Sequence, residues 1–101
     1  MDVEASIDLV CARLLDSTSI PVKIRSRNKV SQSEVDELFA AIDFLTDYYS
    51  GEELIPRKLA LAFVDVYVGF SIKDGFFDDI ESQRYEDIGI SLQEKAYELF
   101  G

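Results

Sequence analysis

The residues best suited to chemistry lie in segment 74–87, where six carboxylates surround three aromatic rings and a single cation, Arg84. This combination suits the binding of a basic protein surface, because charge steers the encounter and buried aromatic rings supply much of the binding energy. The segment therefore predicts a partner-binding surface. Its candidate residues are Asp74, Asp78, Asp79, Glu81, Tyr85, Glu86 and Asp87.

The same segment allows a plainer interpretation, in which the acids form a solvated face and the phenylalanines pack in the core. For Phe76 and Phe77 we expect the core, since phenylalanine is among the residues most often buried. For the acids as a group we expect partner binding.

A second acidic cluster is expected around a pair of tyrosines, Tyr48 and Tyr49. Two of its acids are four residues apart and share a helical face, where like charges cost some stability. A solvated helix face is an equally good interpretation of this cluster. Its candidate partner-binding residues are Asp43, Asp47, Glu52 and Glu53.

The residue types that are absent exclude most catalytic chemistry. With no histidine and only one cysteine, Cys11, the sequence offers no structural zinc site and no Cys–His or Ser–His–Asp catalysis. It has no phosphate-binding P-loop, and the run 78–87 lacks the ligand pattern of a calcium loop. With twenty carboxylates in the chain, chance pairs are inevitable and indicate no hydrolase. We expect no enzyme, no metal and no cofactor.

The charge balance describes a compact acidic domain. Twenty acids face ten bases, and residues 30–101 alone carry sixteen acids against five bases. Since 48% of the residues are hydrophobic, with seven Phe and five Tyr, the chain is no disordered acidic tail. We expect one domain, 1–101. The single cysteine, the lack of a secretory signal and the absence of a membrane-spanning run favour a cytoplasmic protein without membrane contact.

Four of the ten bases lie in the stretch 23–29: Lys23, Arg25, Arg27 and Lys29. Without interleaved aromatic residues, and on a chain of charge -10, they make a poor phosphate-binding surface. Nucleic acid is therefore disfavoured as a partner. We expect this stretch to fold back on the acidic body or to lie far from the partner site.

Hydrophobic spacing predicts helices in the first half of the chain. Residues 2–16 show the three- and four-residue steps of an amphipathic helix. Residues 20–25 alternate and predict a short edge strand or an extended basic loop. Ser31 and Glu34 have the spacing of a capping box, which begins a helix over 32–50 that ends before Gly51.

The second half is more ambiguous. Residues 56–70 favour a helix, but their alternation from Val64 onward also fits a strand in a hairpin closed by Asp74–Gly75. A short helix is expected over 76–84, and Ser91 with Glu94 predicts a capping box that begins the last helix. The expected fold is an all-α bundle of four to five helices, and the alternative is an α+β fold with a short hairpin near 63–78.

The stretches Glu34–Asp43 and Tyr48–Glu53 combine an acidic helix, paired tyrosines and an acidic turn. In this they resemble the helical immunity proteins of bacterial nuclease toxins, which include colicin immunity proteins and those of contact-dependent growth inhibition. The resemblance implies a small cytoplasmic inhibitor that covers the cationic active site of an RNase or DNase, with carboxylates in place of phosphates. It assigns no binding residue.

Two other functions fit the same composition. A DNA-mimic protein would use the negative surface against DNA-binding proteins, and would place its carboxylates along an extended face. A helical interaction module would contact its partner through an apolar groove, and its acids would serve solubility alone.

Overall fold

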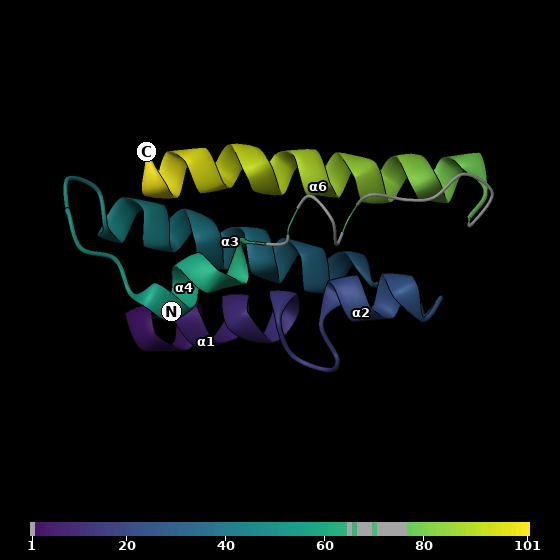
Figure 1. Ribbon diagram of the computed structural model, residues 1–101, viewed down its shortest axis with the longest axis horizontal. Helices are drawn as coiled ribbons and strands as arrows, with labels where there is room; N and C mark the ends of the chain where they lie inside the picture. The colour runs from purple at the N-terminus through teal and green to yellow at the C-terminus, as the bar shows by residue number, and fades with distance from the viewer. Residues whose placement is uncertain (1, 65, 67–69, 71–76) are drawn as a thin grey trace.

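The computed structural model describes residues 2–64, 66, 70 and 77–101, and these residues fold as a bundle of α-helices (Figure 1). No β-strand occurs in this part of the chain. The expected all-α bundle of four to five helices is therefore confirmed. The helices are α1 (Val3–Leu14), α2 (Ile20–Arg25), α3 (Gln32–Tyr48), α4 (Arg57–Ala62) and α6 (Asp79–Phe100).

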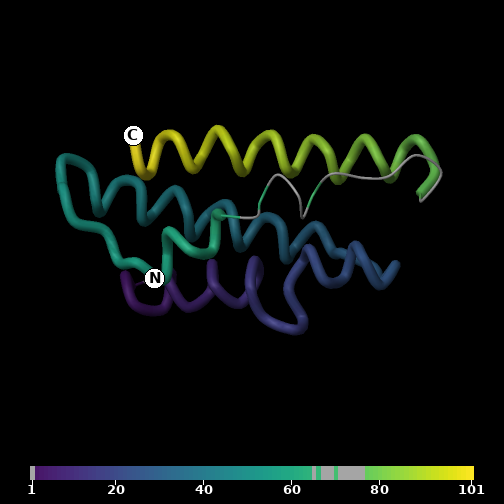
Figure 2. Tube along the Cα trace, viewed as in Figure 1, coloured from purple at the N-terminus to yellow at the C-terminus, as the bar shows by residue number. Residues whose placement is uncertain are grey.

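The helix α3 is central, with α1 packed on one side and α6 on the other. The two short helices, α2 and α4, both contact α1. The chain runs in the same direction along α3 and α6 and in the opposite direction along α1 (Figure 2). The molecule is elongated and measures 42 × 22 × 19 Å. The helices α3 and α6 both run along its long axis and together form one long side (Figure 1).

The core is built around the apolar stripe of α3. Leu38, Ile42 and Leu45 recur at helical spacing and are fully buried. Each such side chain contributes about 1.5–3 kcal/mol through burial. Val10 from α1 and Leu92 from α6 are equally buried, so the two outer helices each present one apolar stripe to the interior.

The expected start of α3 is confirmed in detail. The Ser31 hydroxyl accepts a hydrogen bond from the backbone N–H of Glu34 at 3.1 Å, and the Ser31 N–H donates to the Glu34 carboxylate at 2.9 Å. The helix ends at Tyr48, two residues before the expected end. Gly51 then adopts a φ of 81°, which a residue with a side chain rarely takes.

The expectation of a strand or extended loop over 20–25 is wrong, because these residues form α2. Ser19 is its N-cap and Pro21 lies in its first turn, where a missing N–H has no helical partner to lose. Ile20 and Ile24, four residues apart, are both buried. The four-residue spacing of Ile20 and Ile24 therefore reflects a buried helical face, and the apolar–polar alternation over 20–25 does not indicate a strand.

The expected helix over 56–70 is confirmed only in part, because α4 ends at Ala62 and helical backbone returns at Val66 and Phe70. The N–H groups of Phe63 and Val64 donate to carbonyls three residues back, at 3.0 and 3.2 Å, which tightens the last turn and ends the helix. Val66 and Phe70 are buried. The alternative hairpin turn at Asp74–Gly75 lies outside the described residues.

The expectation of two separate helices, 76–84 and one beginning at Ser91, is wrong. Both are part of the single 22-residue helix α6, whose N-cap is Asp78. Its carboxylate accepts a hydrogen bond from the N–H of Glu81 at 2.8 Å. Ser91 lies in the middle of α6, because a buried stripe that includes Tyr85 and Leu92 continues past it.

The helices are amphipathic throughout the described part of the chain. None of those residues forms a helix that is both long enough and apolar enough to cross a membrane.

Candidate protein-binding face

Formal charge is divided unevenly between the two sides of the bundle. The helices α3 and α6 together carry eleven acids and two bases, a net charge of −9. The helices α1, α2 and α4 carry two acids and five bases, a net charge of +3. Since α3 lies between α6 and α1, one long side of the molecule is strongly negative and the opposite side is weakly positive.

Ion pairs neutralise only part of the negative side. Arg13 pairs with Glu37 at 3.0 Å and Lys23 pairs with Glu34, so the positive side satisfies two acids of α3. The second pair also means that the basic stretch folds back on α3 at Lys23. The remaining eight acids of α3 and α6, apart from Asp43, form no ion pair with a described residue: Asp36, Asp47, Asp79, Glu81, Glu86, Asp87, Glu94 and Glu98.

The acids expected to form one surface within 74–87 divide between different roles. Asp78 caps α6, so one carboxylate oxygen is already bonded to the helix. Glu81 lies beside Tyr85, whose pKa its charge affects. Asp79, Glu86 and Asp87 are exposed at positions that share the solvent side of α6. Asp74 lies outside the described residues.

Tyr85 is a core residue and not a surface anchor, which corrects its expected role. It is 1% exposed, and its ring contacts Phe77 edge to face with centroids 5.2 Å apart. Burial raises its pKa, and the negative charge of Glu81 raises it further. The expected core position holds for Phe77, which is half-buried against the core, whereas Phe76 lies outside the described residues.

The solvent side of α6 forms a continuous surface that we call the α6 outer face. It carries carboxylates together with two large exposed hydrophobic side chains, Ile90 at 54% and Tyr97 at 81%. Neither base of α6 lies on it, since Lys95 bonds to Asp43 of α3 and Arg84 bonds to the carbonyl of Val30, just before α3. Its members, all exposed, are Asp79, Gln83, Glu86, Asp87, Ile90, Glu94 and Tyr97.

Sequence reasoning missed four residues of this face: Gln83, Ile90, Glu94 and Tyr97. The signal that could have found them is a series of three- and four-residue steps that runs unbroken from Asp79 to Tyr97. Interpreting Ser91 as a helix start interrupted that series.

The second acidic cluster lies at the other end of the negative side, around the C-terminus of α3. Asp43 is engaged by Lys95 at 2.6 Å and is therefore not a free carboxylate. Asp47 and Tyr48 are exposed one turn further along. Glu52 and Glu53 are exposed in the following loop. The structure thus brings the loop acids close to the end of α3 but separates all four from Asp79.

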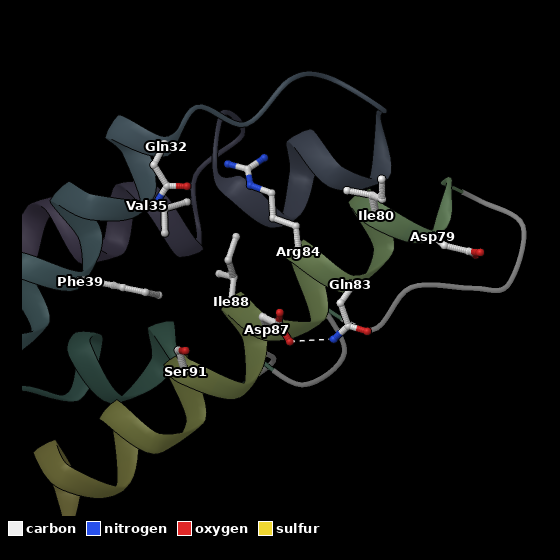
Figure 3. A pocket seen from close by; sticks show the side chains of 10 residues that line it. All are labelled: Gln32, Val35, Phe39, Asp79, Ile80, Gln83, Arg84, Asp87, Ile88 and Ser91. Carbon is white, nitrogen blue, oxygen red and sulfur yellow. Dashed lines mark hydrogen bonds between the residues drawn. The ribbon is translucent and has the colours of Figure 1, made fainter.

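A groove of about 700 Å³ lies between α3 and α6 (Figure 3). Its floor is apolar and comes from both helices, through Val35 and Phe39 of α3 and Ile88 of α6. The carboxylates of Asp79 and Asp87 line its α6 side. The α3–α6 groove therefore places apolar surface directly beside the α6 outer face.

The single thiol of the chain, Cys11, lies on α1 and not on the negative side. Burial raises the pKa of the Cys11 thiol, which keeps it protonated and unreactive at neutral pH. No group of three or more Cys, Asp or Glu residues in the described part of the chain is arranged to hold a metal ion. The arrangement is suited to contacting a cationic surface.

Comparisons with protein-family models, with curated proteins and with solved structures each found no match.

Proposed function

We propose that this protein is a stoichiometric, non-catalytic inhibitor of a basic toxin, in the manner of an immunity protein, and that it acts in the cytoplasm. The favoured target is a nuclease, an RNase or a DNase. The observation that carries the proposal is the concentration of a net charge of −9 on α3 and α6. The similarity of Glu34–Asp43 and Tyr48–Glu53 to helical immunity proteins supports the same class.

The proposed mechanism is electrostatic and steric occlusion. A nuclease active site is cationic because it must bind phosphates, so carboxylates fixed on a rigid helix can occupy the same positions. The acids of the α6 outer face would pair with those cations. Ile90 and Tyr97 would be buried in the contact and would contribute apolar and aromatic binding energy.

Three double variants with the same change in net charge test which surface binds. Glu86→Lys with Glu94→Lys reverses the α6 outer face, and Glu52→Lys with Glu53→Lys reverses the loop acids. The matched control, Glu4→Lys with Asp16→Lys, reverses exposed acids on or next to α1. None of these six acids is in an ion pair with a described residue.

The experiment is co-expression with the product of the adjacent gene, followed by co-purification, a nuclease assay and surface plasmon resonance at several salt concentrations. We expect a complex whose on-rate falls steeply with salt. The α6 double variant should weaken binding by roughly tenfold or more, whereas the control should change it little. Equal effects of the α6 variant and the control, or binding insensitive to salt, would contradict the proposal.

Asp78 requires a separate variant because it caps α6. Asparagine is as good an N-cap as aspartate, so Asp78→Asn should keep the free energy of unfolding while it removes one negative charge. If Asp78 also contacts the toxin, Asp78→Asn will weaken the complex without changing the urea midpoint of the free protein. Unchanged affinity would assign Asp78 to helix capping alone.

A DNA mimic is the second candidate, because the negative side extends along both α3 and α6. A mimic would bind several unrelated DNA-binding proteins in competition with DNA. An immunity protein would protect against one toxin. Competition binding with two unrelated DNA-binding proteins separates these functions.

A further inference from the structure

Two polar contacts join α6 to α3 and to the segment just before it, and the α3–α6 groove lies between them. Near the start of α6, the Arg84 guanidinium donates to the backbone carbonyl of Val30 at 3.0 Å. Toward its end, Lys95 pairs with Asp43 and lies 5.1 Å above the ring of Phe39. Ile88 of the buried stripe of α6 reaches the floor of the groove, and the space above it between these contacts is open in the described part of the chain.

The groove has a floor and a rim of different chemistry. The side chains of Val35, Phe39 and Ile88 approach one another across the floor (Figure 3). Ile80 extends this apolar surface at the open end, where it is 85% exposed. The one cation of the lining, Arg84, already donates a hydrogen bond to the backbone carbonyl of Val30, just before α3.

Carboxylates stand beside this apolar floor on both helices. Asp79 and Asp87 line the α6 side, and Asp87 is held in place by the side-chain amide of Gln83 at 2.8 Å. On α3, the exposed Asp36 accepts a hydrogen bond at 2.9 Å from the side-chain amide of Gln32, which lines the groove. An occupant must therefore be apolar where it meets the floor and cationic at its flanks.

From Ile80 to Ser91 the groove follows about 17 Å of α6, which is three helical turns. We propose that the α3–α6 groove docks a cationic amphipathic helix of the partner protein, with its apolar stripe on the floor and its lysines or arginines along the acidic rim. This inference deepens the proposed function and rests on it for the identity of the partner as a basic protein. The α3–α6 groove would then make both the apolar and the acidic contacts with the partner, as other grooves that bind amphipathic helices do.

The test uses a synthetic amphipathic peptide of about four turns, with leucines at i, i+3, i+4 and i+7 and lysines on both flanks. Two matched peptides replace either the leucines with serine or the lysines with glutamate. Fluorescence anisotropy gives the affinity, and ¹⁵N NMR locates the binding site. We expect only the leucine–lysine peptide to bind tightly, with the largest shifts at Phe39, Ile88 and Ser91.

Two groove variants and a control make the location testable. Ser91→Phe fills the groove, and Ile80→Ser removes apolar surface at a position too exposed to affect folding. Ser33→Phe adds the same ring on the exposed surface of α3 that turns toward Glu37, away from the groove. Ser91→Phe should weaken peptide binding by roughly tenfold or more and Ile80→Ser should weaken it less, whereas Ser33→Phe should leave it unchanged.

Several outcomes would overturn the groove proposal: equal binding to Ser91→Phe and Ser33→Phe, equal binding of the serine peptide, or NMR shifts centred on Glu52 and Glu53. Dimerisation of the free chain through the groove would identify a second copy as the occupant and would also overturn it. If the native toxin loses affinity for the α6 double variant but not for Ser91→Phe or Ile80→Ser, the proposed function stands and the groove proposal falls. If the peptide binds in the groove but no toxin is bound, the proposed function falls alone.

Discussion

The carboxylate of Glu34 connects α2 to the start of α3. It receives hydrogen bonds from Lys23 of α2 and from the backbone N–H and hydroxyl of Ser31. The bond from Lys23 is the main cause that lowers its pKa below the ordinary value, and the bonds from Ser31 lower the pKa further. Glu34 therefore begins α3 and also holds α2 in place.

This lowered pKa predicts a pH dependence of stability. The stabilisation is fully present above the unfolded-state pKa, roughly 4.3, and is lost as the pH falls through the lower folded-state pKa. Glu34→Gln, which keeps the capping-box geometry, should cost roughly 1 kcal/mol at pH 7, and the gap to the wild type should close on acidification. Urea unfolding across this pH range measures the gap. Asp36→Asn is the control for loss of one charge in the same turn, and a constant gap for Glu34→Gln would contradict the prediction.

Gly89 is required by a close approach in the core. A Cβ at this position would lie 2.7 Å from the Cβ of Phe70. Gly89→Ala should therefore lower the free energy of unfolding by about 1–3 kcal/mol through overpacking, which outweighs the gain of about 1 kcal/mol in helix propensity. Thermal denaturation measures the change.

The control for Gly89 is a double-mutant cycle with Phe70→Gly, which removes the obstructing carbon. In that background Gly89→Ala should become stabilising, because only the propensity gain remains. If Gly89→Ala destabilises both backgrounds equally, the cause is not the contact with Phe70.

At the scale of elements, Ser31 and Ser91 form a matched pair, since each precedes a glutamate by three residues. Ser31 caps α3, so Ser31→Ala should cost about 1 kcal/mol. Ser91 lies inside α6, so Ser91→Ala should be neutral or stabilising by up to about 0.5 kcal/mol. Urea denaturation of both variants tests this, and a loss of about 1 kcal/mol for Ser91→Ala would mean that α6 is broken there.

The sequence predicted α3 because its local signals agree with its packing. The capping box at Ser31, the apolar stripe and Gly51 all indicate the same helix. For α2 the same six residues fit two periodicities, and contact with α1 decides between them. For α6, the helix continues past the Ser-x-x-Glu pattern at Ser91 because its buried residues lie both before and after that serine. The pattern alone does not show this, since it depends on how the residues before Ser91 pack.

The candidate site was predictable in composition but not in orientation. The acids of segment 74–87 were recognised, yet their direction depends on the phase of the whole 22-residue helix. That phase buries Tyr85 with Leu92 and turns Ile90 outward. Because the predicted helix ended near Arg84, the sequence could not show that Tyr97 shares a face with Asp79.

At the scale of the whole molecule, the separation of charge has two opposed consequences. Like charges on α3 and α6 repel one another in the folded protein, which reduces its stability. The same charges attract a basic partner. Added salt screens both interactions, so it should strengthen the fold and weaken the complex.

The thermal midpoint of the free protein should therefore rise by a few degrees as NaCl increases from about 10 mM to about 150 mM, over which the Debye length falls from about 30 Å to about 8 Å. Exposed pairs such as Lys58–Asp8 act in the opposite direction, but each contributes at most about 1 kcal/mol. The variant with Glu86→Lys and Glu94→Lys should show a smaller rise than the control with Glu4→Lys and Asp16→Lys, because only the former relieves repulsion on α6. Circular dichroism at each salt concentration measures the midpoints. A thermal midpoint that falls as salt is added would mean that the surface ion pairs contribute more to stability than the repulsion among the acids removes. The negative charge of α3 and α6 would then not destabilise the free protein, and binding a basic partner would relieve no repulsion.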